Sequence, residues 1–182
     1  LRIGWGQTGN SNIGSYKWGS AMSTMDTGLG MSYRPANMAN LDIKWETQEQ
    51  WNVGIDLGFF GGNLSFTVDW YKKMSKDMLM PLTLPSIMGT GGNESSALAA
   101  PWGNYGDIEN TGIELTVSAR PVTTKDFSWS TEVNFSRNKN KVKSLAGGSA
   151  LLGMGQWTDV VSRSAEGESL YNFYGYKTAG VY

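Results

Sequence analysis

The chain has 182 residues, with 15 Lys and Arg against 16 Asp and Glu, which gives a formal net charge of −1. Because no positive excess exists to neutralise phosphates, the composition argues against a nucleic-acid-binding protein. The sequence contains no Cys and no His. A disulfide framework, a thiolate metal site, a Ser-His-Asp triad and a zincin motif are therefore excluded, and an enzyme would be left with carboxylate, Lys or Tyr chemistry.

The length suits one ordinary domain, but the composition differs from that of an average domain. Gly accounts for 24 of the 182 residues, charged residues for 17% and aromatic residues for 12%; an average domain has roughly 7% Gly and roughly 25% charged residues. No apolar run is long enough to predict a transmembrane helix. The chain starts inside an expected strand, Leu1 to Trp5, without an initiator Met or a signal peptide. We therefore expect a piece of a larger protein.

The first predicted hairpin begins at Trp51. Residues 51–59 alternate strictly between apolar and polar or Gly side chains, and so do residues 64–71, which predicts two strands. Gly61-Gly62 lies between them and is typical of a type I′ turn. With this two-residue loop, Phe60 opposes Asn63, and the pairing sorts every apolar side chain to one face. A slip of one residue would destroy that sorting, which fixes the predicted register.

A second hairpin follows the same design. Apolar residues alternate with polar ones over 113–119 and again over 127–136, around a turn region at 121–126. A shift of two residues keeps the sorting, so the sequence leaves this register open. Long segments rich in Gly, Ser and Asn occupy residues 10–42, residues 74–111 and the chain from residue 139 on. The hairpins therefore have short turns at one end and long loops at the other.

Two environments would bury the apolar face, namely a second sheet or lipid. Short turns on one side, long loops on the other and strands of about 10 residues are typical of a transmembrane barrel, whose apolar residues point outward. In both hairpins the apolar face continues into basic residues at the long-loop end. These continuations comprise Trp70, Lys72, Met74 and Lys76 in one strand, and Arg137, Lys139, Lys141 and Lys143 in the other. This favours an aromatic girdle at Trp70 and contact with anionic head groups beyond it. The competing interpretation is that the basic residues mark a solvated strand exit.

The sequence therefore predicts an all-β chain that forms an antiparallel segment of a transmembrane β-barrel with long extracellular loops. About five or six strands fit into the chain, whereas a closed barrel needs at least about eight. The membrane interpretation thus requires further strands outside these residues.

Three motifs invite a different interpretation. Residues 4–9 spell G-x-G-x-x-G, but a dinucleotide site needs this motif to open a helix, and here a loop is expected to follow. Asp107 and Glu109 form a carboxylate pair without a rigid set of further ligands, which favours solvated loop charges over a Ca²⁺ site. Asp56 and Asp69 share the polar face of adjacent strands, where a lumen or solvent accounts for them.

Aromatic side chains in the expected loops are the best candidates for ligand contacts. Flat rings stack on sugars or pack on peptide side chains, and neighbouring Asn, Ser and Asp supply hydrogen bonds. The candidates are Trp102, Tyr105, Trp157 and Tyr174, with Tyr171, Phe173 and Tyr176 as further members of the set. The competing interpretation is that each ring only holds the loops together. We predict no catalytic, cofactor-binding or metal-binding residue.

The sequence resembles the SusC/RagA family of TonB-linked outer-membrane transporters. Similar blocks occur in the family's order along nearly the whole chain. They are LRIGWGQTGNSN at 1–12, IKWETQEQWNVGID at 43–56, residues 64–73, DML at 77–79, NTGIEL at 110–115, FSW at 127–129, NFSRNKNKV at 134–142 and FYGY at 173–176 with GV at 180–181.

The resemblance implies that residues 1–182 are an internal part of a receptor barrel of about 22 strands, without its plug domain and remaining strands. It implies TonB-driven uptake of an oligosaccharide or oligopeptide across the outer membrane of a Bacteroidetes-type bacterium. A SusD-like lipoprotein would cap the long-loop side, and TonB with ExbB and ExbD would act through the plug. No enzyme activity and no cofactor are implied. The alternative is a soluble, secreted β-sandwich that binds carbohydrate through exposed aromatic residues.

Overall fold

The computed structural model describes residues 1–82, 87, 98–145, 148, 150–154 and 160–180. The described residues form ten strands and one short 3-10 segment. In chain order these are β1 (Arg2–Asn10), β2 (Met22–Thr27), β3 (Gly30–Pro35), β4 (Glu46–Phe59), η1 (Phe60–Gly62), β5 (Leu64–Pro81), β6 (Trp102–Thr123), β7 (Ser128–Leu145), β8 (Leu151–Met154), β9 (Val160–Ser164) and β10 (Asn172–Phe173). No helix long and apolar enough to span a membrane occurs in the described part of the chain.

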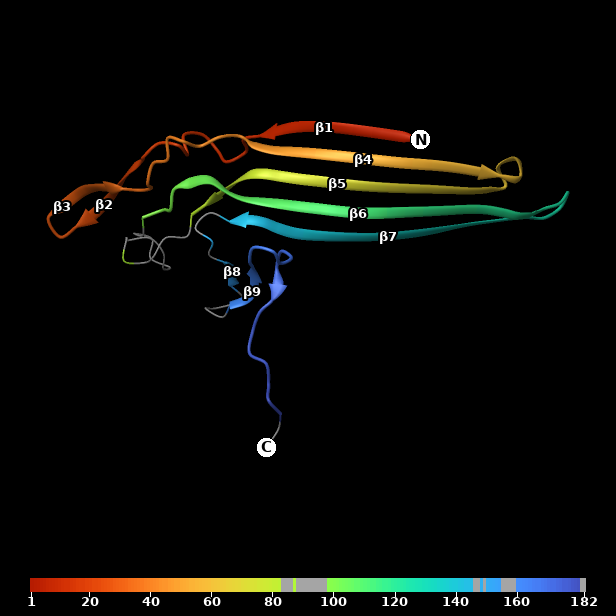
Figure 1. Cartoon of the computed structure of the whole chain (residues 1–182). Helices are drawn as coiled ribbons and strands as arrows, with labels where there is room; N and C mark the ends of the chain where they lie inside the picture. The colour runs from red at the N-terminus through yellow and green to blue at the C-terminus, as the bar shows by residue number, and fades with distance from the viewer. Residues whose placement is uncertain (83–86, 88–97, 146–147, 149, 155–159, 181–182) are drawn as a thin grey trace. The chain divides into compact units, whose positions relative to one another are not determined.

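The main element is a five-stranded sheet with the order β1-β4-β5-β6-β7 (Figure 1). The two predicted hairpins form its centre and one edge, as β4–β5 and β6–β7, and β1 lies beside β4 at the other edge. This agrees with the five or six strands expected of the barrel segment. The chain forms two compact units, one comprising Leu1–Thr8, Gln48–Ser75 and Asp107–Tyr182, and the other Gly9–Thr47 and Lys76–Gly106.

The turn between β4 and β5 has the predicted geometry. The Asn63 N–H donates to the Phe60 carbonyl at 3.3 Å, which leaves Gly61 and Gly62 as the two central residues. Gly61 has φ 64° and ψ 25°, and Gly62 has φ 94°. These values are close to those of a type I′ turn, which needs positive φ at both positions and thus favours Gly.

The side chains of β4 and β5 confirm the predicted register. The Thr67 hydroxyl donates to Asp56 Oδ1 at 3.1 Å, and these two residues are directly opposed in the predicted pairing. Gly54 is opposed to Asp69, and a Cβ placed on Gly54 would lie only 2.3 Å from Asp69 Oδ1. Both contacts belong to the polar face, so the apolar side chains of the hairpin share the other face.

The register of β6 and β7, which the sequence leaves open, follows from two side-chain hydrogen bonds. Thr116 donates to Asn134 Oδ1 at 2.8 Å, and Ser118 donates to Glu132 Oε2 at 3.2 Å. The turn is closed by the Thr124 N–H, which donates to the Phe127 carbonyl at 2.7 Å. The two side-chain contacts select the pairing in which Thr116 lies beside Asn134 and Ser118 beside Glu132.

The expectation of a continuous loop over residues 74–111 was wrong. β5 extends to Pro81, and β6 already begins at Trp102. The strands continue because each backbone finds its hydrogen-bonding partners in the neighbouring strand, whatever side chains it carries. Neither face of these extensions is uniformly apolar, so the period-two hydrophobicity that marks a half-buried strand is missing. The same holds for β7, which continues to Leu145.

The segment over residues 10–42 also contains a hairpin that was not predicted from the sequence. β2 pairs with β3 from Met22 opposite Pro35 to Thr27 opposite Gly30, and the Thr27 hydroxyl donates to the Gly30 carbonyl at 2.6 Å. Asn37 organises the adjoining chain, because its Nδ2 donates to the Gly19 carbonyl at 2.7 Å and its Oδ1 accepts the Ala21 N–H at 2.8 Å.

A small core forms where the end of β7 meets residues 165–170. Val142 is fully buried, and its backbone exchanges hydrogen bonds with Glu168 at 2.9 Å and with Gly167 at 2.8 Å. The Leu145 N–H donates to Glu166 Oε1 at 2.6 Å. The sheet ordered β10-β9-β8 belongs to the same unit. The region after residue 139, expected as a polar loop, is therefore partly strand.

We predict that Gly54→Val destabilises the hairpin whereas Gly58→Val does not. Both glycines lie on the polar face of β4, but a Cβ on Gly54 would meet Asp69 Oδ1 at 2.3 Å and Arg2 Nη2 at 2.7 Å, and a Cβ on Gly58 meets nothing within 4 Å. Overpacking of this kind costs about 1–3 kcal/mol. Thermal unfolding of the full-length protein in detergent measures the difference, and equal midpoints for the two variants would contradict the geometry.

Candidate membrane surface and ligand-contact residues

The apolar residues of the five-stranded sheet remain exposed on one face. On β7, Val133 is 60% exposed and Phe135 57%, while on β4 Ile55 is 43% and Leu57 47% exposed. Among the described residues, the buried hydrophobic side chains are Ile108, Val142 and Leu145. A transmembrane barrel would turn this apolar face to lipid, whereas a β-sandwich would bury it against a second sheet.

Tryptophans mark the long-loop end of the apolar face. The rings of Trp5 on β1 and Trp51 on β4 lie 6.2 Å apart between centroids, inclined by 50°. Both indole N–H groups donate to Glu49 Oε1 at 3.3 Å. Trp70 on β5 is also exposed, at 41%. Indole rings with one apolar and one hydrogen-bonded side are typical of a membrane interface.

Trp70 was the predicted member of this girdle, and its exposure agrees with that role. The contribution of Trp5 and Glu49 was missed, because the sequence does not show that β1 pairs with β4. Ile3 and Trp5 are alternate residues of β1, so their side chains share one face of the strand. This is the only sequence signal that could have suggested a place for Trp5 in the girdle.

Beyond the tryptophans, the same face carries an ion-pair cluster across three strands. Lys72 Nζ on β5 lies 3.0 Å from Glu109 Oε2 on β6, and Lys143 Nζ on β7 lies 3.7 Å from the same oxygen. Glu109 precedes the apolar alternation of β6, which begins at Ile113. The hydrogen bond from Lys72 lowers the pKa of the Glu109 carboxyl against the opposing effect of desolvation, so the carboxyl is ionised at neutral pH.

The prediction that Asp107 and Glu109 are solvated loop charges was wrong. Both lie on β6, and Asp107 Oδ2 accepts the Ser144 hydroxyl of β7 at 2.9 Å. Two extended strands whose charged side chains face each other form cross-strand pairs, which the sequence could not show without the register. Among the described residues, no three Asp or Glu side chains gather in a way that could hold a metal ion.

The opposite, polar face carries a second charged cluster. The Arg2 guanidinium of β1 binds Asp56 of β4 through Nη1 and Asp69 of β5 through Nη2, the latter at 2.8 Å. Asp56 and Asp69 lie on the polar face, as predicted, and Arg2 is the partner that was missed from the sequence. The side chains are 39–53% exposed, so the pair adds little stability by itself. It holds three strands in one register through a forked donor.

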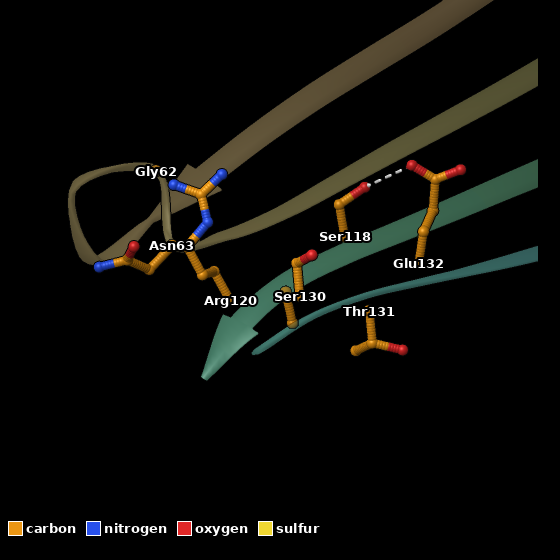
Figure 2. A pocket seen from close by; sticks show the side chains of 8 residues that line it. Gly62, Asn63, Ser118, Arg120, Ser130, Thr131 and Glu132 are labelled. Carbon is orange, nitrogen blue, oxygen red and sulfur yellow. Dashed lines mark hydrogen bonds between the residues drawn. The ribbon is translucent and has the colours of Figure 1, made fainter. Parts of the chain in front are cut away.

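A hollow of about 330 Å³ lies beside the short turns. It is lined by Gly62, Asn63, Ser118, Ala119, Arg120, Ser130, Thr131 and Glu132. Figure 2 shows the Arg120 side chain extending toward the turn, and the hydrogen bond between Ser118 and Glu132 further along the strands. The backbone N–H of Arg120 donates to the Asn63 carbonyl at 2.7 Å. Polar side chains therefore line this face down to the turns.

Two of the predicted ligand-contact residues lie on β6 rather than in a loop. Trp102 is half-buried at the start of the strand, and its carbonyl accepts the Asn40 amide at 2.8 Å. Tyr105 packs over the backbone of Gly103, because a Cβ there would lie 2.4 Å from the Tyr105 ring. For Tyr105, this packing favours the interpretation that the ring holds the chain together.

The other candidates lie toward the C-terminus. Tyr174 belongs to a different unit from Trp102 and Tyr105, is 51% exposed, and its N–H donates to the Val161 carbonyl at 3.0 Å. Phe173 and Tyr176 are completely exposed, so neither ring holds loops together within the described chain. Trp157 lies outside the described residues. Of the three described main candidates, Trp102 and Tyr105 belong to one unit and Tyr174 to the other.

The glycine motif at residues 4–9 lies within β1. It does not open a helix, and its extended backbone cannot cradle a pyrophosphate at a helix N-terminus, so the dinucleotide interpretation has no structural basis.

An antiparallel sheet with one apolar face open, Trp at its border and basic residues beyond defines a segment of a transmembrane β-barrel. The sequence model of a family described as "TonB dependent receptor-like, beta-barrel" matches residues 1–174, and the chain belongs to this family.

The relatives identify the SusC/RagA branch of the family. The chain is 34% identical over its whole length to "TonB-dependent receptor P3" of Formosa agariphila, of which it covers 18%. It is 34% identical, over 81% of its length, to "TonB-dependent receptor SusC" of Bacteroides thetaiotaomicron, of which it covers 15%. Among solved structures, the "RagAB peptide transporter" superimposes on 94% of the chain with a TM-score of 0.75 and 28% identity, and the chain covers 18% of it.

Proposed function

We propose that the whole of residues 1–182 belongs to the barrel domain of a TonB-dependent transporter in the outer membrane of a Bacteroidetes-type bacterium. The exposed apolar face of β4 to β7 carries this proposal, because an aqueous compartment would not tolerate it. Support comes from the family match and from the SusC and RagAB relatives. The chain spans less than a fifth of these relatives, so the transporter would be assembled with strands outside it.

The transported nutrient is proposed to be an oligopeptide or an oligosaccharide. The structurally similar RagAB is a peptide transporter, which supports the first class. A SusD-like lipoprotein would cover the long-loop side, and TonB with ExbB and ExbD would supply energy through a plug domain. TonB-dependent receptors are not a class of enzymes, and we propose that this one moves its substrate without covalent chemistry and without a cofactor.

Within this proposal, Trp102, Tyr105, Trp157 and Tyr174 remain the candidates for ligand contact. Of the described ones, Tyr174 has the most accessible ring, since Trp102 and Tyr105 are half-buried. A stacked sugar or an apolar peptide side chain would use such a surface.

Placing Lys on the two faces of one hairpin tests the membrane assignment. Ile55→Lys in the full-length protein puts a charge into the lipid-facing band and is expected to cost about 2–4 kcal/mol near the bilayer midplane. Thr67→Lys places the same side chain on the polar face near Asp56, which accepts the Thr67 hydroxyl at 3.1 Å. Outer-membrane assembly, measured by heat-modifiable mobility, should fall only for Ile55→Lys. Equal assembly of both variants would contradict the lipid-facing assignment.

The partner is tested by affinity purification of the tagged full-length receptor from outer membranes. We expect a SusD-like lipoprotein to co-purify in stoichiometric amount, and deletion of its gene to reduce uptake of oligopeptides or oligosaccharides at least about 10-fold. Uptake of a small diffusible solute through porins serves as the control. A receptor that purifies alone and transports at an unchanged rate without the lipoprotein would refute the partnership.

A further inference from the structure

A second hollow, of about 440 Å³, lies where the apolar face of the sheet reaches the short turns. It will be called the turn-end hollow, and its lining consists of Phe60, Asn63, Leu64, Ala119, Arg120 and Pro121. The Arg120 N–H donates to the Asn63 carbonyl at 2.7 Å, which holds the start of β5 beside the end of β6. Leu64 and Ala119 belong to the apolar face by their place in the alternation. The turn-end hollow therefore opens on the face that the proposed barrel turns to lipid.

Aromatic rings mark this end of the apolar band, as the tryptophans mark the other. Phe59 on β4 and Phe66 on β5 pack edge to face, with their ring centroids 6.0 Å apart. Phe127 and Trp129 are exposed at the same end of the β6–β7 hairpin. The eight steps from Trp51 to Phe59 span about 26 Å along β4, comparable with the height of about 25 Å of an outward-facing apolar band. The turn-end hollow thus lies at the second border of the band, where the head groups of the other leaflet begin in the proposed barrel.

Phe60 has a backbone conformation that aromatic residues seldom adopt. Its φ is 54°, in the left-handed region that is unfavourable for a bulky side chain. Its side chain lines the turn-end hollow and is still 79% exposed, so burial within the described chain does not offset this cost. Contact of the ring with a molecule in the hollow would offset it.

Arg120 is the one charged residue in the lining of the turn-end hollow, and it forms no ion pair with any described residue. Figure 2 shows its side chain extending toward the turn at Gly62. Glu132 lines the neighbouring polar hollow together with Arg120, but each of its carboxylate oxygens accepts a side-chain hydrogen bond at 3.2 Å from elsewhere. Lys125 and Asp126 lie in the β6–β7 turn and do not line the turn-end hollow. An unmatched cation therefore stands beside an apolar hollow.

We propose that the turn-end hollow binds a glycerophospholipid of the leaflet on the short-turn side. The Arg120 guanidinium would hold the phosphate through its planar fork, and the beginning of an acyl chain would lie against Leu64 and Ala119. The Asn63 amide, in the same lining, can donate to an ester carbonyl of the lipid. A lipid fits better than a protein partner because the hollow continues the apolar band, which lipid covers in the proposed barrel. The proposal thus rests on the proposed function.

The test is photo-crosslinking of the full-length receptor in an uncharged detergent. The probe is a phosphatidylglycerol with a photoreactive diazirine near the glycerol end of one acyl chain, and the comparison probe is the diacylglycerol with the same chains and no phosphate. Peptide mass spectrometry locates the crosslinks and gives the half-saturating concentration at residues 60–64 and 119–121. We expect the phospholipid to saturate there at an about fivefold lower concentration, the value of one basic residue at an anionic surface. Equal saturation by both probes, or crosslinks without enrichment at these residues, would overturn the proposal.

Two variants test the cation and the hollow. R120Q removes the charge, and A119F fills the hollow with an apolar ring that a lipid-facing position tolerates. Each is expected to raise the half-saturating concentration of the phospholipid about fivefold. The double variant A119F/R120Q should raise it no further, because both changes displace the same phosphate. Additive losses in the double variant would assign the two residues to separate sites and contradict the proposal.

The matched controls are K125Q, which removes a cation of the β6–β7 turn, and V117F, which adds the same ring to the apolar face of β6 two residues away. Neither residue lines the turn-end hollow, so each should change the half-saturating concentration less than about twofold. Losses equal to those of R120Q and A119F would overturn the proposal. If R120Q does not assemble, the comparison of A119F with V117F decides by itself.

Assembly of the wild-type receptor into the outer membrane is recorded separately, by heat-modifiable mobility. A receptor that assembles but shows no phosphate-dependent crosslinking at the turn-end hollow refutes the lipid site alone. Failure of the wild-type receptor to assemble refutes the proposed function.

Discussion

In hydrocarbon, every backbone N–H and C=O must find its partner inside the protein, because lipid offers none. A strand meets this condition only through its two neighbours, and it then has to present one face to lipid and the other to the interior. Residues 51–59 and 64–71 alternate strictly between apolar and polar or Gly side chains because each strand has to meet this constraint. The Gly61-Gly62 turn, the pairing of Asp56 with Thr67 and the exposed Ile55 and Leu57 all follow from it.

The two faces of the sheet have different means of fixing their register. On the lipid side, apolar side chains are non-directional and would tolerate a shift of two residues. On the polar side, hydrogen bonds and charges are directional, as in the fork from Arg2 to Asp56 and Asp69. Contacts on the polar face therefore specify which residues pair, whereas contact of the apolar face with lipid favours insertion into the membrane. At the long-loop border, Glu49 and Glu109 hold the tryptophans and lysines that mark the end of the band.

The band itself was predictable from sequence, and its continuation was not. Residues 51–71 alternate clearly because one face meets lipid, whereas the beginning of β6 at Trp102 carries polar, Gly and aromatic residues on both faces. Beyond the hydrocarbon, strand pairing leaves no periodic hydrophobicity to detect. The clusters around Glu109 and Arg2 were missed for a second reason, since they join strands far apart in sequence. Trp102 and Tyr105 were placed in a loop because this part of β6 has no alternating hydrophobicity, whereas both lie on the strand.

In the proposed barrel, the odd-numbered residues 51–59 of β4 and the even-numbered residues 64–70 of β5 face lipid. The chain contains no Cys, so a single fluorophore can be attached to Ile55→Cys, Leu57→Cys and Val68→Cys, and for comparison to Gly58→Cys, Ser65→Cys and Thr67→Cys. The measurement is quenching of each fluorophore by phospholipids that carry a spin label in the acyl chain, with the full-length receptor in vesicles. We predict strong quenching at positions 55, 57 and 68 and weak quenching at 58, 65 and 67. Equal quenching on both faces, or the reverse order, would contradict the lipid-facing assignment.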